Sequence, residues 1–304
     1  MREKVLVTGG NGQLATCIKE GINHYFFKHD IQFKDVDEID ITNKESLYNS
    51  LNEIKPTIII NCAAYTDVER AEMDNNTPYL VNCIGCENLA EWCKDNNGLL
   101  IHISTDYVFD GSMNYPYKEN NPRVPKNAYG YTKSQGEDKI MKSNCKYIIL
   151  RTSWLYSRHG NNFFNKMISK ILNHNTNTLY APIDEVSVPT NSRNLSDAIL
   201  RICSEYSENE NKEKLHGVYH YVDNGVASRY DFLTAIYEYV KEKYPCSCNI
   251  TPCYSDKFPS EVKRPKYSVL DNKKVTDTFK TVSTKDWRLS VKNEIKEMFK
   301  EYYS

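Results

Sequence analysis

The first half of the chain alternates between short apolar runs and longer amphipathic stretches. Apolar residues fill four runs without polar alternation, at 4–7, 57–63, 99–104 and 147–151. Runs of this kind are typical of strands buried on both faces of a parallel sheet. Helical spacing of apolar residues separates them, near 13–21, 44–54, 78–95 and 129–142. This alternation of strand and helix predicts a doubly wound α/β fold.

The second half is less regular. Helical patterns occupy 163–172, 194–206, 229–243 and 291–302. The stretch 207–214 is charged, which favours an exposed loop, and 244–268 is rich in Pro, Cys and Ser, which favours a segment that wraps the surface or a cleft. With 304 residues, the chain is long enough for two domains of about 100–200 residues each.

Charge and hydropathy exclude several classes of function. The 39 Lys and Arg residues nearly balance the 40 Asp and Glu residues, which gives a formal charge of −1. A protein built mainly to hold nucleic acid needs a basic surface, so we predict no nucleic-acid partner. No apolar stretch approaches the roughly 18–20 residues of a membrane span. Because the N-terminus also lacks the pattern of a signal peptide, we expect a cytoplasmic protein without a membrane partner.

The ten cysteines predict reduced thiols rather than disulfides or metal ligands. Cys83 and Cys86 have the spacing of half a zinc site, but with Cys93 they lie in an amphipathic helical stretch, and no second ligand pair follows at a suitable distance. The three cysteines within 246–253 also have no histidine nearby. We therefore predict no metal site.

A glycine-rich segment joins the first predicted strand to the first predicted helix. Residues 5–15 read VLVTGGNGQLA, with Gly9, Gly12 and Ala15 at intervals of three. Glycines at such a junction permit a tight turn and let backbone amides approach a pyrophosphate at the helix N-terminus. Ala15 is small enough for the helix to pack closely on the strand. The position directly after a buried strand predicts a dinucleotide site.

Tyr129 and Lys133 are four residues apart and therefore share one face of a predicted helix. Such pairs arise by chance in a chain with 23 tyrosines. Tyr129 is distinguished by Thr105, whose hydroxyl follows a buried strand and so lies at the carboxyl edge of the sheet, where ligands bind in open α/β sheets.

These three side chains have the chemistry that ketone reduction requires. A phenol with its ordinary pKa of about 10 is a poor acid at neutral pH, and a neighbouring ammonium lowers that pKa. We therefore expect Lys133 to lower the pKa of Tyr129. Tyr129 would give a proton to a carbonyl oxygen while a nicotinamide delivers hydride to the carbon, and Thr105 would polarise the same oxygen.

Five segments together resemble the dTDP-4-dehydrorhamnose reductases, a branch of the extended short-chain dehydrogenase/reductases. They are TGGNGQL at 8–14, NCAAYTDVERAE at 61–72, STDYVFDG at 104–111, YGYTK at 129–133 and RTSWLY at 151–156. The resemblance extends over nearly the whole chain and implies a Rossmann-type doubly wound parallel sheet. It implies an NAD(P)-binding domain at 1–155, which also receives part of 185–225, and a smaller C-terminal α/β substrate-binding domain in 156–304.

The resemblance also implies an activity: reduction of the C4 keto group of dTDP-4-dehydro-L-rhamnose by NADPH or NADH, which completes dTDP-L-rhamnose. Thr105, Tyr129 and Lys133 would be catalytic, and Lys133 would also hold the nicotinamide ribose. The residues implied to bind the cofactor are Gly9, Gly12, Gln13, Leu14, Asp40, Ile41, Ala63, Ala64, Tyr65, Thr66, Tyr129 and Lys133. Those implied to bind the nucleotide-sugar substrate are Thr105, Asp106, Trp154 and Arg264. The family commonly dimerises, so we expect a homodimer.

Some positions depart from the family pattern. Cys62 replaces a usual alanine, which is a small-for-small change. Arg229 stands where the family often has an aromatic residue, and DEVS at 184–187 replaces an Asp-Gln-aromatic-Gly run. These last two departures leave open which sugar or base the protein takes. Reduction of another nucleotide-linked 4-keto sugar, epimerisation, and a non-catalytic regulatory subunit that binds a dinucleotide are the alternatives.

The preference between NADH and NADPH depends on where the second strand ends. Asp30 would accept the adenosine ribose hydroxyls of NADH, whereas Lys28 and Lys34 would meet the 2′-phosphate of NADPH. One further residue is interpreted as structural: His102, in an apolar strand, is expected to be a hydrogen-bonded core histidine.

Overall fold

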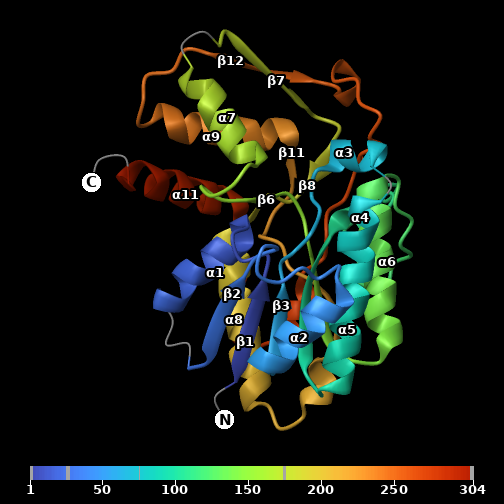
Figure 1. The fold of residues 1–304 in the computed structure, drawn as a ribbon. Coiled ribbons are helices and arrows are strands. Elements are labelled where there is room, and N and C mark those ends of the chain that lie inside the picture. The colour runs from blue at the N-terminus through green and yellow to red at the C-terminus, as the bar shows by residue number, and fades with distance from the viewer. Residues whose placement is uncertain (1–2, 25–27, 75, 174–175, 302–304) are drawn as a thin grey trace.

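A six-stranded parallel sheet forms one half of the structure, a computed structural model that describes residues 3–24, 28–74, 76–173 and 176–301 (Figure 1). The strand order is β10 (Gly217–His220), β5 (Lys146–Thr152), β4 (Leu99–Thr105), β3 (Ile58–Asn61), β1 (Lys4–Thr8) and β2 (Asp30–Lys34). Because β2 and β3 lie on opposite sides of β1, the sheet has a topological switch point there, where such sheets bind ligands. The predicted doubly wound parallel sheet is confirmed.

Alternate residues of each strand pack on opposite faces of the sheet. Val5 and Val7 lie in a core with α1 (Gln13–His24) and α8 (Ser192–Glu208), whereas Leu6 lies in a second core with α2 (Lys44–Ile54) and α5 (Gly85–Asp95). The same alternation continues through β3, β4 and β5. Both faces are therefore covered, which is why these strands appear in the sequence as continuous apolar runs.

The sequence patterns located the four central strands and the helices between them. The helix predicted at 78–95 is interrupted: α4 (Thr77–Tyr79) leads into a π-helical turn at Leu80–Ile84 before α5, and α3 (Val68–Met73) was not predicted. β10 and α8, from the segment 185–225, join the sheet and its helical cover. The division of the chain at residue 155 stays a prediction.

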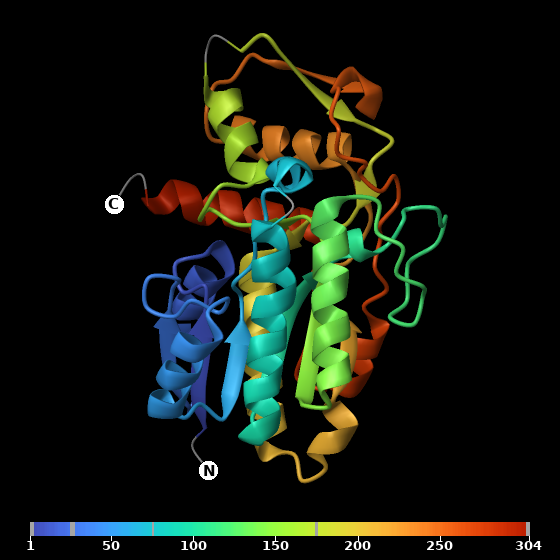
Figure 2. The same cartoon turned by 45° about the vertical axis from the view of Figure 1, so that its right-hand side comes forward.

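A second, smaller unit lies above the carboxyl ends of the strands (Figures 1 and 2). Its core is built by α7 (Phe163–Leu172), α9 (Arg229–Lys241) and α11 (Trp287–Glu301). Three two-stranded pairings complete it and connect it to the sheet: β7 (Thr178–Pro182) with β12 (Asn249–Cys253), β8 (Val186–Ser187) with β11 (Ala227–Ser228), and β6 (Leu155–Tyr156) with β9 (Thr190–Asn191).

The helical ends differ somewhat from the predicted ones. α11 begins at Trp287 rather than at residue 291, because the buried indole anchors its first turn in the core, and Tyr302 lies outside the described residues. The remaining helical elements are α10 (Lys273–Thr278) and the 3₁₀ turns Asp106–Val108, Lys212–Leu215 and Ser255–Lys257. Of the helices in the described ranges, none has the length and apolar character that crossing a membrane requires.

A buried ion pair ties α6 (Ala128–Ser143) to the sheet. Arg151 of β5 donates to both carboxylate oxygens of Glu137, at 2.9 Å from Nε and 2.7 Å from Nη2. Glu137 also accepts from the Ser104 hydroxyl at 2.6 Å and from Arg123 at 3.2 Å. With Glu137 fully buried and Arg151 only 2% exposed, these bonds replace the water that both charges lose.

We predict that Arg151→Met lowers the free energy of unfolding by about 3–5 kcal/mol. The substitution removes the arginine that binds both oxygens of Glu137, and the carboxylate stays buried. Urea unfolding followed by circular dichroism measures the loss. Arg70→Met is the matched control: Arg70 pairs with Asp67 at 3.5 Å and its side chain is 76% exposed, so it should cost less than about 1 kcal/mol. Equal losses in the two variants would contradict the prediction.

Candidate active site

A cavity of about 820 Å³ lies between the carboxyl ends of the strands and the second unit. The lining combines residues from the glycine-rich loop, from the ends of β3, β4 and β5, and from α6, α7 and α9. The predicted site residues that line it are Gly12, Gln13, Leu14, Ala64, Thr66, Thr105, Asp106, Tyr129, Lys133, Trp154 and Arg264. The fold thus brings together residues that are up to 252 positions apart, from Gly12 to Arg264.

The glycine-rich loop has the geometry of a phosphate-binding turn. Gly9 has φ +66°, and a Cβ there would lie 2.8 Å from the backbone nitrogen of Ala63, so only glycine fits. The Gly12 amide donates to the Gly9 carbonyl at 3.0 Å, and α1 begins at Gln13. The positive end of α1 therefore faces the cavity with little side-chain bulk before it, which fits the pyrophosphate of a dinucleotide.

Several residues implied to bind the cofactor lie elsewhere. The Asp40 carboxylate accepts from the amide and hydroxyl of Thr42, and the Ile41 side chain is buried in the core under α5. The Tyr65 amide donates to the side chain of Asn82 at 2.9 Å. Neither Asp40 nor Ile41 is among the residues that line the cavity, and neither are Gly9, Ala63 and Tyr65. Their roles in cofactor binding stay predictions.

Asp30 is the wrong carboxylate for the adenosine ribose. It is the first residue of β2 and pairs with Lys4, at the end of the strand remote from the glycine-rich loop. The carboxyl end of β2 is Lys34, which pairs in register with Thr8 and contacts Glu38 at 2.6 Å. Asp35 follows it and accepts from the Asn11 amide of the loop at 2.7 Å. The sequence did not locate this end because the strand is short and half-exposed.

Tyr129 and Thr105 meet at the floor of the cavity. Tyr129 lies in the first turn of α6, and Thr105 is the last residue of β4. Burial raises the pKa of the Tyr129 phenol well above its usual value, and a hydrogen bond with Thr105 opposes the rise. Gly130 permits this placement, since a Cβ there would lie only 2.2 Å from the carbonyl oxygen of Tyr107.

The expectation that Lys133 lowers the pKa of Tyr129 is wrong in this structure. The net direction for Tyr129 is upward, and its causes do not include the Lys133 ammonium. The Lys133 nitrogen turns instead toward the Ile103 carbonyl at 2.7 Å and the His102 imidazole at 3.2 Å. Helical spacing correctly placed both side chains on one face of α6, but it could not show which groups the nitrogen of the long lysine side chain contacts.

Asp106 is a buried carboxyl beside these residues. It accepts from the Ser268 hydroxyl at 2.5 Å and from Thr105 at 3.2 Å. Burial raises the pKa of Asp106 to about 6, against the opposing effect of these hydrogen bonds and of the Arg229 charge. An acid with this pKa changes its charge close to neutral pH, and it does so within the cavity.

The two departures from the family pattern meet at the wall of the cavity. The Arg229 guanidinium lies 3.7 Å from the centre of the Trp154 ring, and its Nε lies 3.6 Å from a carboxylate oxygen of Glu185. Trp154 has φ +41°, which is rare for a bulky residue and is often found at functional sites. The sequence showed Arg229 and Glu185 only as separate anomalies.

Arg264 reaches the cavity but has a partner already. Its guanidinium forms an ion pair with Glu69 of α3, and the Ser260 hydroxyl donates to the same carboxylate at 2.9 Å. This contact links the loop at 260–264 of the second unit to α3, which lies next to that unit in both views (Figures 1 and 2).

Other cavity residues were missed. Asn162 donates to the side chain of Gln13 at 2.6 Å, so Gln13 binds the start of α7 through its side chain. Asn162 belongs to the sequence segment GNNF at 160–163, directly before α7. Glu137, one turn after Lys133, does not line the cavity but holds α6 to the sheet, and extending the same four-residue spacing would have found it.

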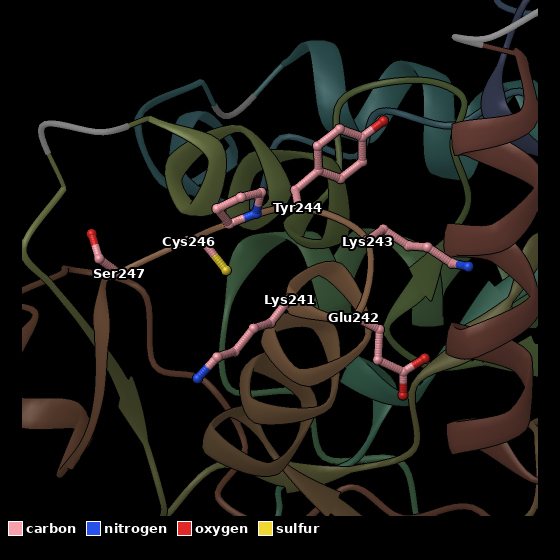
Figure 3. A pocket seen from close by; sticks show the side chains of 7 residues that line it. Lys241, Glu242, Lys243, Tyr244, Cys246 and Ser247 are labelled. Atoms are coloured by element: carbon pink, nitrogen blue, oxygen red, sulfur yellow. The ribbon is translucent and has the colours of Figure 1, made fainter.

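A second hollow, of about 500 Å³, lies at the end of α9 (Figure 3). Seven consecutive residues, 241–247, line it. Burial raises the pKa of Cys246, which makes its thiol a weaker nucleophile, and none of the predicted site residues is present. Over the described ranges, no group of three or more His, Cys, Asp or Glu side chains is arranged to hold a metal ion.

Comparisons with known proteins agree with this geometry. The family model described as RmlD substrate binding domain matches residues 3–300. The dTDP-4-dehydrorhamnose reductase of Aggregatibacter actinomycetemcomitans is 34% identical over 295 residues, which cover 95% of this chain and 97% of that protein. The dTDP-4-keto-6-deoxy-D-glucose reductase of Streptomyces niveus is 32% identical over 277 residues, which cover 89% of each.

Solved structures are similar as well. A dTDP-4-dehydrorhamnose reductase from Clostridium acetobutylicum superposes with a TM-score of 0.88 at 35% identity, covering 97% of this chain and 99% of that one. The dTDP-4-dehydrorhamnose reductase of Bacillus anthracis, in complex with NADP, has a TM-score of 0.88 at 32% identity and covers 98% and 100% of the two chains.

The raised pKa of Asp106 predicts a pH dependence of stability. The folded pKa of about 6 is above the ordinary value of 3.8, so the folded protein holds this proton more tightly than the unfolded chain does. The free energy of unfolding should therefore fall as pH rises through this window. Asp106 should account for roughly 3 kcal/mol of this decrease in the free energy of unfolding, and Asp106→Asn should abolish that part.

Urea unfolding of both proteins at pH 4, 5, 6 and 7 measures this effect. Burial also raises the pKa of Asp223 to about 6, so the free energy of unfolding of the Asp106→Asn protein should still decrease with pH, but by less than in wild type. If the difference in free energy of unfolding between wild type and Asp106→Asn were the same at all four pH values, the prediction would be contradicted.

Proposed function

This chain belongs to the RmlD substrate binding domain family, and we propose that it reduces the C4 keto group of dTDP-4-dehydro-L-rhamnose to give dTDP-L-rhamnose, with NADPH or NADH. One observation carries the assignment: Thr105, Tyr129 and Lys133 line the same cavity as the N-terminal end of α1. A hydride donor held at the glycine-rich loop and a keto group above Tyr129 would meet within it.

The side chains divide the proton chemistry between them. The nicotinamide dinucleotide supplies a hydride when it is bound. Tyr129 transfers its Oη proton to the C4 oxygen, which becomes the hydroxyl of the product. Because burial keeps the Tyr129 pKa high, the phenol retains its proton at neutral pH until negative charge develops on that oxygen. Thr105 donates a hydrogen bond to the same oxygen and so orients the carbonyl.

The charged ends of the two ligands need different partners. Amides at the start of α1 would hold the dinucleotide pyrophosphate, since the protein as a whole is nearly neutral. Arg264 would bind the diphosphate of the nucleotide sugar, and for that it must release Glu69. Lys133 would hold the nicotinamide ribose, while Asp106 and Trp154 would face the sugar.

We further propose that the protein is a cytoplasmic homodimer. All ten cysteines are free thiols, and reduced cysteines are usual in the cytosol. Twofold homodimers are the commonest assembly among soluble oligomeric proteins in general. Sedimentation equilibrium tests this state, and a single species with the monomer mass of 35.3 kDa would overturn it.

The contact of Arg229 with Trp154 and Glu185 favours a second candidate, the reduction of a different nucleotide-linked 4-keto sugar. A cation here gives the sugar pocket a hydrogen-bond donor where the family often has an aromatic surface. The regulatory-subunit alternative has less support, because Thr105, Tyr129 and Lys133 are all present in the cavity.

We predict that Tyr129→Phe lowers kcat by about 10²–10⁴-fold with the dTDP-linked keto sugar, because it removes the proton donor. Dinucleotide binding, followed by fluorescence of the reduced cofactor, should change little. Tyr131→Phe is the control, since this neighbouring tyrosine of α6 is 53% exposed and does not line the cavity. Wild-type turnover by Tyr129→Phe would overturn the assigned role.

We predict that Arg229→Met changes the order of kcat/KM values among nucleotide-linked 4-keto sugars, with a change of about tenfold or more for at least one of them. Arg288→Met is the matched control, because Arg288 also lies on a tryptophan, at 4.4 Å from the Trp287 ring, but does not line the cavity. The same order of substrates in wild type and Arg229→Met would exclude Arg229 as a determinant of specificity.

A further inference from the structure

An ion pair bridges the two walls of the cavity. Glu69 of α3 and Arg264 of the loop at 260–264 both line the cavity, and they pair through Oε1 and Nη2. In the chain, α3 follows β3 of the sheet, whereas the loop belongs to the second unit (Figures 1 and 2). A ligand that binds between the two walls therefore meets both partners of this ion pair.

Two donors from one turn converge on the Glu69 carboxylate. Besides the Arg264 guanidinium, the Ser260 hydroxyl lies 2.9 Å from Oε2 and 3.2 Å from Oε1 of Glu69. The Ser260 oxygen accepts from the Val262 amide at 3.1 Å and from Arg264 Nη1 at 3.3 Å. Because both of these groups donate to the oxygen, the single hydroxyl proton of Ser260 is left for the carboxylate.

This turn has the chemistry of a phosphate site. An arginine fork fits phosphate as well as carboxylate, and a hydroxyl donates to either anion. Of the described residues that line the cavity, four are basic: Lys133, Lys166, Arg229 and Arg264. Lys133 is buried at the floor, and Arg229 already stacks on Trp154. Arg264 is therefore the arginine at the cavity whose partner is an exposed carboxylate that a ligand could replace.

We propose that Ser260 and Arg264 form the binding site for the diphosphate of the nucleotide sugar, and that Glu69 occupies this site in the free protein until the diphosphate displaces it. The inference rests on the proposed function, which assigns Arg264 to the substrate. It adds Ser260 as a ligand-binding residue and Glu69 as an internal competitor that lowers the affinity for the substrate.

The two partners of the ion pair differ in exposure, which decides which of them moves. The Glu69 side chain is 53% exposed, so its carboxylate can turn into water and lose little. The Arg264 side chain is 29% exposed and stays against the cavity. The hydrogen bond from Arg264 lowers the pKa of Glu69, so the competitor carries its full charge at neutral pH.

Binding of dTDP to the whole protein, followed by isothermal titration calorimetry without cofactor or keto sugar, tests the proposal. Glu69→Gln removes the competing charge and keeps the shape of the side chain. The Kd for dTDP should therefore fall by about three- to tenfold. In the Glu69→Gln protein, the further change Ser260→Ala should raise this Kd again by a similar factor, and no effect of Ser260→Ala would exclude Ser260 from the site.

Asp67→Asn is the matched control. Asp67 also lines the cavity, two residues before Glu69, but it pairs with Arg70. An asparagine can still accept from the Arg70 amide at the start of α3, so the helix keeps its cap. Loss of this charge should change the Kd for dTDP by about twofold or less, because solvent and salt screen it.

A double-mutant cycle shows whether Glu69 acts through Arg264. Arg264→Met should weaken dTDP binding, and in this protein Glu69→Gln should no longer lower the Kd, because the competitor has lost its partner. Glu69→Ala is measured in the same way, so the test does not depend on the folding of one variant.

A lower Kd in Glu69→Gln and Glu69→Ala, which disappears in the Arg264→Met protein, would support the proposal. An unchanged or higher Kd, an equal fall in Asp67→Asn, or a fall that persists with Arg264→Met would overturn it. Turnover of the dTDP-linked keto sugar by wild type is measured separately. Absence of turnover would refute the proposed function and leave the comparison of dTDP binding valid.

Discussion

The buried face of α6 is the constraint on which the site depends. It places a tyrosine, a lysine and a glutamate at successive turns, Tyr129, Lys133 and Glu137, against the carboxyl ends of the strands. Lys133 and Glu137 are at most 1% exposed, whereas Tyr129 is partly exposed at the cavity. Unpaired polar groups in such a place cost several kcal/mol, and charges cost more. Each of these side chains therefore needs a partner, and the sheet must supply it.

The sheet supplies these partners through register. On the face toward α6, Thr8, Asn61 and His102 are neighbours across three strands, and Ser104 pairs with Arg151 on the next two. The first group leads to Lys133, and the second binds Glu137. A shift of one residue in any of these strands would turn its polar group to the opposite face. Lys133 and Glu137 of α6 are thus held by side chains that the register of the strands places next to one another.

The other wall of the cavity is built by the second unit and is more particular to this chain. There Arg229 joins Trp154 to Glu185, and Arg264 joins α3 to the loop at 260–264. Two changes that look unrelated in the sequence compensate each other, because an arginine in a half-buried pocket needs the nearby glutamate. The sheet and α6 therefore set one wall of the cavity, while the second unit sets the shape and charge of the other.

The sequence by itself determined the central strands, the glycine-rich turn and the pairing of Tyr129 with Lys133, because these follow from local periodicity and from glycine's backbone freedom. It did not determine the short edge strand β2 or where the Lys133 side chain ends, it left the role of Asp30 open, and it misjudged the pKa of Tyr129. Burial and hydrogen bonding set these properties, and the partners come from distant segments. Only the tertiary structure brought Asn61, His102 and Lys133 into one row, since strand register is a relation between segments that no single segment contains.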